Sequence, residues 1–262
     1  IDLWLGKNVI MCIQPEPNGT GGALRAALTE IEDSTSELVG VTFGDEPFLN
    51  QAMFIQTLVS HFMAQADVTL CAKIPEVVED KGGIFFDTDG KFCGTTEWYD
   101  MTQAEQSYMQ ENLKHGKAYT NTGITIIRRQ AMTERIDKLK PHKNGTEYHH
   151  VDLIRLFYED GLSTNVHVYR NQVVSGVNRW SNVLTGENMI YEATRQKLAQ
   201  QGVRIDPSAQ ITLEDDTIQI GRGCHLSGKI HLDQGVVIGD YCRLDNVVLT
   251  GNCIVGDFVG LK

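Results

Sequence analysis

Two polar side chains stand directly after predicted strands, in positions where they could bind a ligand. Gln14 follows the apolar run 9–13, and Asp45 follows the run 38–43. In an open α/β sheet the carboxyl ends of the strands face the crevice that binds ligands. A carboxylate such as Asp45 offers the hard oxygen that Mg²⁺ prefers, and a carboxamide such as Gln14 offers both a donor and an acceptor. The alternative for Asp45 is an aspartate that only caps its turn.

A glycine-rich loop, residues 14–22, joins the first predicted strand to a helix. It contains Gly19, Thr20, Gly21 and Gly22. Glycines let the backbone come close to a bound molecule, and the N-terminus of the following helix adds partial positive charge. A tight turn with no ligand is the alternative, because a loop of this kind is weak evidence by itself.

Strand-like and helix-like segments alternate in the first part of the chain, and these elements must position the two polar residues. After the helical segment 23–31 come a strand at 38–43, a helix from Gln51 and a strand at 68–72. Alternation of this kind predicts an α/β domain with a mostly parallel sheet.

The last part of the chain follows a six-residue period instead. One series of aliphatic residues is Ile220, Leu226, Leu232, Ile238, Leu244, Leu249, Val255 and Leu261, with a single five-residue step. A second apolar series, four residues later, is Cys224, Ile230, Val236, Cys242, Val248, Cys253 and Val259. This hexapeptide repeat predicts a parallel β-helix whose coils stack their aliphatic residues inward. A helix over 182–202, stopped by Gly202, is expected between the two parts.

Composition excludes several classes of function. Lys and Arg total 23 against 34 Asp and Glu, a net charge of -11, so nucleic acid is not an expected partner. The sequence has no apolar run of membrane-spanning length, so no membrane partner is expected. The six cysteines form no CxxC pair, which removes the usual zinc or redox motif. We expect reduced thiols and a cytoplasmic location.

With these motifs in place, the chain resembles a family of sugar nucleotidyltransferases. Residues 14–23 resemble the base-binding loop of the N-acetylglucosamine-1-phosphate uridyltransferases, which are fused to a hexapeptide-repeat glucosamine-1-phosphate acetyltransferase. Segments 43–47, 121–124, 145–148 with Asp152, and 176–178 match further motifs in the same order. The resemblance implies a nucleotidyltransferase domain at 1–181, a linker helix at 182–202 and a left-handed β-helix at 203–262.

The activity that the resemblance implies is Mg²⁺-dependent transfer of UMP from UTP to N-acetylglucosamine 1-phosphate. The products would be pyrophosphate and UDP-N-acetylglucosamine, a precursor of the bacterial cell wall. Asp45 and Asn178 would be the catalytic residues and the magnesium ligands. The substrate-binding residues would be Gln14, Gly19, Thr20, Phe43, Gly44, Asp45, Gly82, Glu97, Asn121 and Asn178.

The sugar side departs from the family, so the identity of the sugar stays open. Phe43 stands where a tyrosine is usual, Tyr99 where a lysine is usual, and His149 and His150 replace a tyrosine and an aliphatic residue. The uridylyl side is better preserved, with Gln14 placed to pair with uracil.

The family's phosphate loop would precede this chain, and its acetyl-transfer histidine would follow it. We therefore expect a fragment that lacks both ends, with negligible transferase activity alone, from a protein that is a homotrimer when complete. Two alternatives stay open. The complete protein could act as a hexapeptide acetyltransferase, or it could be a non-catalytic subunit that binds sugar nucleotides or scaffolds an assembly.

Overall fold

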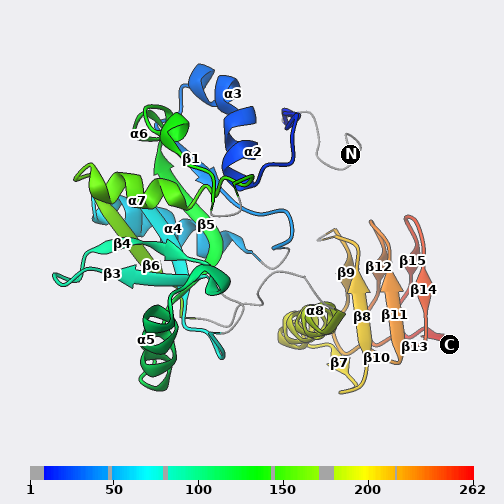
Figure 1. The fold of residues 1–262 in the computed structure, drawn as a ribbon. Coiled ribbons are helices and arrows are strands. Elements are labelled where there is room, and N and C mark those ends of the chain that lie inside the picture. Colours follow the sequence, from blue (N-terminus) through cyan, green and yellow to red (C-terminus); the bar gives the residue numbers. More distant parts are fainter. Residues whose placement is uncertain (1–8, 47–48, 79–81, 143–144, 171–179, 216) are drawn as a thin grey trace. The chain divides into compact units, whose positions relative to one another are not determined.

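The chain forms two compact units, Ile1–Gly176 and Val177–Lys262, each with its own apolar core. The computed structural model describes residues 9–46, 49–78, 82–142, 145–170, 180–215 and 217–262. Figure 1 shows a sheet with helices in the first unit and a stack of short strands in the second. An α/β region followed by a parallel β-helix is therefore confirmed.

A mixed sheet forms the centre of the first unit. Its strands run in the order β4-β3-β5-β2-β6, and β1 also pairs with β5. The bounds are β1 Leu38–Val41, β2 Val68–Lys73, β3 Gly83–Phe86, β4 Phe92–Thr96, β5 Thr120–Arg128 and β6 Thr164–Val168. Among the described strands of this sheet only β2 and β6 pair in parallel, because β5 runs against β1, β2 and β3, and β3 runs against β4. The sequence pattern predicted mostly parallel strands, and in this respect it was wrong.

Helices pack against this sheet. Their bounds are α2 Thr20–Ala26, α3 Leu28–Asp33, α4 Gln51–Met63, α5 Gln103–Lys114, α6 Arg129–Thr133 and α7 Asp152–Glu159. The predicted helix at 23–31 is two helices, α2 and α3, that meet at Ala27. At the start of α4, Asn50 Oδ1 accepts a hydrogen bond from the Met53 backbone N–H at 3.0 Å. Thr102 and Glu105 form a capping box at the start of α5.

Strand β2 is buried along its whole length and divides the apolar core into two layers. Val68, Leu70 and Ala72 belong to one layer, together with Phe157 of α7. Cys71 belongs to the other layer, which contains Met53 of α4 and Ile126 of β5. This alternation follows from the two-residue period of a strand, which sends successive side chains to opposite faces.

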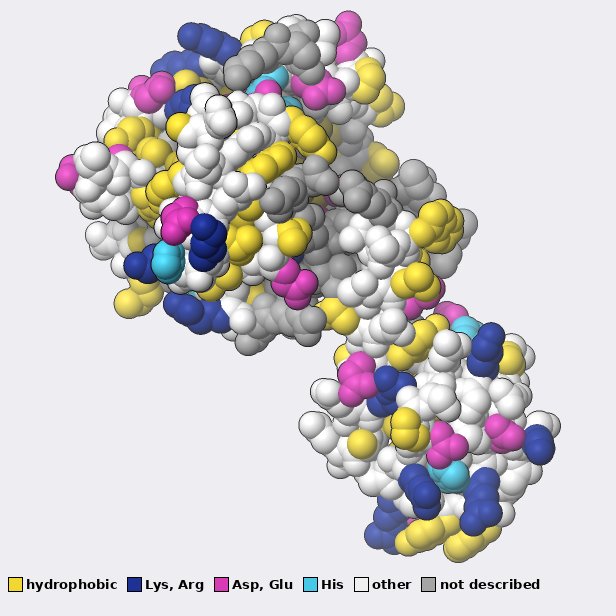
Figure 2. All heavy atoms as spheres, turned by 60° about the horizontal axis from the view of Figure 1, so that its bottom comes forward, with side chains coloured by type: hydrophobic (Ala, Val, Ile, Leu, Met, Phe, Trp, Pro, Cys, Tyr) yellow, Lys and Arg dark blue, Asp and Glu magenta, His cyan; other side chains and the backbone are white. Residues whose placement is uncertain are grey.

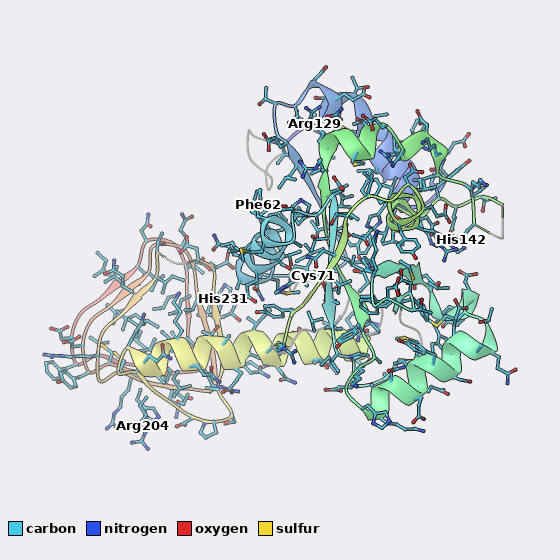
Figure 3. All side chains as sticks on the ribbon, turned by 90° about the vertical axis from the view of Figure 1, so that its left-hand side faces the viewer. Phe62, Cys71, Arg129, His142, Arg204 and His231 are labelled. Atoms are coloured by element: carbon cyan, nitrogen blue, oxygen red, sulfur yellow. The ribbon has the colours of Figure 1, made fainter. Side chains whose placement is uncertain are left out.

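Helix α4 exposes part of its apolar surface. Met53, Thr57 and His61 face the sheet and are buried. The exposed large apolar side chains on the helix are Phe54, Ile55, Val59, Phe62 and Met63. In Figure 3 the label for Phe62 lies on the side of α4 away from Cys71 of β2. Helix α4 is therefore anchored by a stripe that includes two polar residues.

Residues 9–13 form no strand, so the prediction of a first strand there is wrong. Val9, Ile10, Met11 and Ile13 are exposed, and Ile13 has 86% of its surface open to solvent. A short apolar run does not specify a strand unless neighbouring backbone pairs with it. None of the described strands pairs with these residues.

Three parallel sheets enclose the core of the second unit (Figure 1). Their orders are β16-β13-β10-β7, β14-β11-β8 and β15-β12-β9. The bounds are β7 Arg204–Ile205, β8 Gln210–Leu213, β9 Gln219–Ile220, β10 His225–Ser227, β11 Lys229–Leu232, β12 Val237–Ile238, β13 Arg243–Asp245, β14 Val248–Leu249, β15 Ile254–Val255 and β16 Gly260–Leu261. Leu226 pairs with Leu244 of the next coil, so equivalent side chains stack along the helix.

Helix α8, Trp180–Gln200, belongs to this second unit. It contacts β7 and β8, and Leu198 near its C-terminus is buried with Val203 in the core of the β-helix. The predicted helix at 182–202 therefore exists and begins two residues earlier. It covers the first coil of the β-helix.

The inward-facing side chains of the β-helix follow the predicted series with one correction. Leu226, Leu232, Ile238 and Leu244 have at most 2% of their surface exposed. Val248 was predicted to face inward, but it is 64% exposed, and Val247 is buried in its place. In each segment the two inward-facing residues stand two positions apart. Because the step from Leu244 to Leu249 has only five residues, the inward-facing residue that precedes Leu249 is Val247 and not Val248. The same two-residue spacing separates Cys224 from Leu226, which are both buried.

Charges of both signs are interspersed on the surface that Figure 2 shows, with acidic groups in magenta beside basic groups in dark blue. Of the six free thiols, Cys71, Cys224 and Cys242 are buried, whereas Cys12 is exposed. Among the described helices, none combines the length and the apolar content needed to cross a membrane.

We predict that truncating an inward residue of the β-helix costs far more than truncating an outward one. Leu244→Ala leaves a cavity and should lower the free energy of unfolding by about 3 kcal/mol. The matched variant Val248→Ala should change it by less than about 0.5 kcal/mol. Urea unfolding followed by circular dichroism measures both values. Equal losses for the two variants would contradict the corrected register.

Candidate functional site

The glycine-rich loop is fixed to a distant segment by backbone hydrogen bonds in both directions. The Tyr148 N–H donates to Asn18 O at 2.8 Å, and the Gly21 N–H donates to Tyr148 O at 2.7 Å. Gly19 has a φ of 91°, and a Cβ there would lie 2.6 Å from Tyr148 O. Only glycine fits such a position, since both the backbone angle and the close approach exclude a side chain.

Gln14 lies at the entrance to this loop. Its Nε2 donates to Asn18 Oδ1 at 2.8 Å and to Gly19 O at 3.1 Å. Both hydrogens of the amide are therefore used within the loop. A base that took a hydrogen bond from Nε2 would therefore replace one of these two bonds.

His150 joins the loop to the sheet. Its backbone N–H donates to Thr20 Oγ1 at 3.1 Å. Its ring lies between two hydroxyl groups, with Nδ1 3.3 Å from Thr20 Oγ1 and Nε2 3.4 Å from Thr125 Oγ1. Burial, with a smaller contribution from His149, lowers the pKa of His150 to about 4. The imidazole is therefore neutral at pH 7, with one ring nitrogen able to donate and the other able to accept.

Strand β1 leads to the predicted metal ligand. Phe43, just after the strand, meets the His150 ring edge-on with 5.3 Å between the ring centroids. A Cβ on Gly123 would lie 3.0 Å from Phe43 Cδ2, so Phe43 packs tightly on β5. Gly44 and Asp45 follow in an exposed turn. Asn178, the second predicted ligand, lies outside the described residues.

The predicted sugar-binding residues Gly82, Glu97 and Asn121 also lie together. A Cβ on Gly82 would be 2.9 Å from Glu97 Oε1. The Asn121 backbone N–H donates to Gly82 O at 3.3 Å, and its Oδ1 accepts from the Gly123 N–H at 2.8 Å. The structure therefore brings these three residues to one place, at the start of β5.

A cavity of about 260 Å³ opens beside Glu97. Its ionisable lining residues are Glu97, Asp100, Glu105, His142, His149, Asp152 and Arg155. The rings of His142 and His149 stack with 4.1 Å between their centroids. His142 lies beside α7, whose first residue is Asp152, and it is labelled in Figure 3.

Two carboxyl groups in this cavity have raised pKa values. Desolvation by the cavity wall raises the pKa of Glu97, although the residue as a whole is exposed, and His149 opposes the shift. Burial also raises the pKa of Asp152, and His142 opposes it. Both carboxyl groups thus hold a proton more tightly than free carboxylates do. The cavity favours cations or hydrogen-bond donors over anions.

Sequence reasoning found the two clusters but missed residues of the segment that connects them. It singled out His149 and His150 only as departures from a pattern, and it assigned no role to His142 or Asp100. One signal was present in the sequence, because three of the eight histidines fall within residues 142–150.

Comparisons with known proteins find curated relatives of this chain. No family model matches the chain. The bifunctional protein GlmU of Neisseria meningitidis serogroup C is 25% identical over 259 residues, which are 96% of this chain and 54% of that protein. GlmU of Cupriavidus taiwanensis is 27% identical over 258 residues, with the same coverage. GlmU of Acidovorax sp. strain JS42 is 24% identical over 261 residues, 94% of this chain and 52% of that protein. The chain spans about half the length of these curated relatives.

We predict that His150 makes the protein less stable in acid. Its pKa falls from 6.5 in the unfolded chain to about 4 in the folded one, so protonation favours unfolding. The stability it supports is complete above pH 6.5 and is lost as the pH falls toward 4, by about 3 kcal/mol in total.

The comparison is between the wild type and His150→Gln, by urea unfolding at several pH values in metal-free buffer. The difference between the two should change across pH 6.5 to 4, the two pKa values of His150. His115→Gln, which removes an exposed histidine, is the matched control. A His150→Gln profile parallel to the wild type would rule out this role.

Proposed function

We propose, from the premise that this chain is GlmU-like along nearly its whole length, that it forms the base- and sugar-binding part of a sugar-1-phosphate nucleotidyltransferase. The proposed reaction transfers UMP from UTP to a sugar 1-phosphate, with release of pyrophosphate. N-acetylglucosamine 1-phosphate is the proposed acceptor.

One observation carries the proposal. The neighbouring residues His149 and His150 belong to two different clusters: His149 lines the cavity beside Glu97, and His150 holds Thr20 of the glycine-rich loop. A ligand that used both clusters would need a base at one end and a sugar at the other. A nucleoside diphosphate sugar has this form.

On the nucleotide side, the loop offers short polar groups and bare backbone. The carboxamide oxygen of Gln14 can accept a hydrogen bond from uracil, and its amide can donate one in exchange for one of its two bonds within the loop. Gly19 and Thr20 lie at the N-terminus of α2, where backbone N–H groups favour an electronegative ligand. Because the loop is fixed by Tyr148 and His150, little ordering would be needed on binding.

On the sugar side, Glu97 and Asn121 provide acceptors and an amide for hydroxyl and acetamido groups. Gly82 lets the Glu97 carboxylate lie against its backbone, because a Cβ there would be 2.9 Å from Glu97 Oε1. Phe43 offers an aromatic edge without a hydroxyl group, so one donor is absent. These residues support a neutral sugar and do not select one.

Mg²⁺ is the ion that the resemblance implies, and Asp45 fits it in part. Its carboxylate is exposed at a turn after β1, and Mg²⁺ needs only one or two protein oxygens beside phosphates and water. Asp45, with Asn178, would hold the ion. When bound, the ion would screen the negative charge of the triphosphate and the sugar phosphate.

Catalysis of this reaction depends on charge placed around the α-phosphorus more than on covalent participation by the protein. The described residues of the two clusters provide binding and orientation. The proposed homotrimer, and a second acetyl-transfer activity linked to the β-helix, concern the complete protein.

We predict that Asp45→Ala lowers the turnover of the full-length protein about a thousandfold, equivalent to ~4 kcal/mol in the barrier. The assay measures pyrophosphate release from UTP and N-acetylglucosamine 1-phosphate at saturating Mg²⁺. Asp89→Ala, at another exposed turn, is the matched control and should retain wild-type activity. If full-length wild-type protein releases no pyrophosphate but binds the nucleotide sugar, the non-catalytic alternative is correct.

We also predict that Gln14→Ala weakens binding of UDP-N-acetylglucosamine to this chain about tenfold, the value of one or two hydrogen bonds. The variant should also lose its preference for uridine over cytidine nucleotides. Isothermal titration or ligand-detected NMR measures both effects, with Gln103→Ala, an exposed residue of α5, as the control. An unchanged preference would exclude Gln14 from base recognition.

A further inference from the structure

Three side chains in the cavity form a constellation that suits a metal ion of a different kind from Mg²⁺. His142, His149 and Asp152 each offer one ligand atom, and these atoms all lie within 4.8 Å of one another. We propose that they bind a divalent transition-metal ion of the Zn²⁺ class. The inference stands on these residues alone and does not depend on nucleotide transfer.

The distances are close to those that a bound ion requires. His142 Nε2 lies 3.8 Å from Asp152 Oδ2. Two ligands of a tetrahedral Zn²⁺, each about 2.0–2.2 Å from the metal, stand roughly 3.4 Å apart. The rings of His142 and His149 are stacked, with 26° between their planes. Because a metal ion lies in the plane of each imidazole that binds it, the two rings would turn out of this stack so that one nitrogen of each points to the ion.

An outer carboxylate orients the first of these ligands. Asp100 Oδ2 lies 3.3 Å from His142 Nδ1. A proton on Nδ1 would be donated to Asp100, which leaves the Nε2 lone pair free to face Asp152 and the metal. Metal-bound histidines commonly have such a carboxylate partner on their other ring nitrogen. This contact is independent of the three ligands.

The chemistry of the donor set selects the metal. Two imidazoles and one carboxylate suit Zn²⁺ and related transition metals, whereas Mg²⁺ prefers oxygen ligands alone. Three protein ligands leave a position open to the cavity for water or for an oxygen atom of a bound molecule. The nearby carboxylate of Glu97 adds negative charge that favours a cation.

A second group in the described part of the chain serves as a comparison. Glu214, His231 and Asp233 also lie within reach of one another on the β-helix. There His231 Nε2 already contacts both carboxylates, Glu214 Oε1 at 3.4 Å and Asp233 Oδ1 at 3.0 Å. With one imidazole instead of two, this group should bind a transition metal more weakly. It provides matched control variants.

The test is a titration of the metal-free chain with Co²⁺, a spectroscopic substitute for Zn²⁺. We expect one equivalent to bind, with visible absorption typical of a four- or five-coordinate site. Zn²⁺ should displace it, and a large excess of Mg²⁺ should not. Absence of Co²⁺ binding at millimolar metal, or displacement by Mg²⁺ at comparable concentration, would overturn the proposal.

Variants then locate the site. His142→Ala and His149→Ala should each weaken Co²⁺ binding by more than a hundredfold, and Asp100→Asn by about 10–100-fold through loss of the outer contact. His231→Ala should leave binding unchanged. Circular dichroism of each variant confirms folding, and His142→Ala provides an independent result if His149→Ala does not fold. Tight binding that survives in His142→Ala, or is lost in His231→Ala, would refute the assignment.

Discussion

The two-way backbone pairing between Asn18–Gly21 and Tyr148 is the constraint on which the rest of the site depends. These segments are more than a hundred residues apart in the sequence. Once they are paired, Gly19 must be a glycine, His150 must lie over Thr20, and His149 must face the cavity. Backbone hydrogen bonds of this kind do not depend on side-chain identity, so this frame tolerates changes of side chain around it.

His150 illustrates what this frame permits. A buried polar ring costs free energy unless both of its nitrogens have partners. Thr20 and Thr125 provide those partners, one from the loop and one from the sheet. The histidine thus fixes the loop to the sheet through two specific contacts, where an aliphatic residue would pack without direction. In return, the His150 ring must stay neutral to remain buried, because burial lowers its pKa.

The sequence predicted the parts of this protein whose pattern is repeated or local. The β-helix followed from its six-residue period, and α8 from its propensity and its glycine stop. The glycine-rich loop and Glu97 were recognised by resemblance, and the structure places them in the two clusters.

Three features were not predictable from local pattern. Pairing of strands depends on distant partners, so the strand at 9–13 and the mostly parallel sheet were predicted wrongly. The grouping of His142 with Asp100 depends on tertiary contact. The exposure of Val248 depends on how the chain accommodates the five-residue step from Leu244 to Leu249.

This five-residue step also indicates how the β-helix tolerates changes in length. Between Leu244 and Leu249 the chain is one residue shorter than in the other steps, yet β14 still pairs with β11 and β15 with β12. The shortening is absorbed at a corner, and each following face regains its pairing with the coil before it. The fold should therefore tolerate insertions and deletions at corners, whereas an insertion or deletion within a face would turn an aliphatic side chain outward. Lineages of this protein should differ in length at the corners and agree in length along the faces.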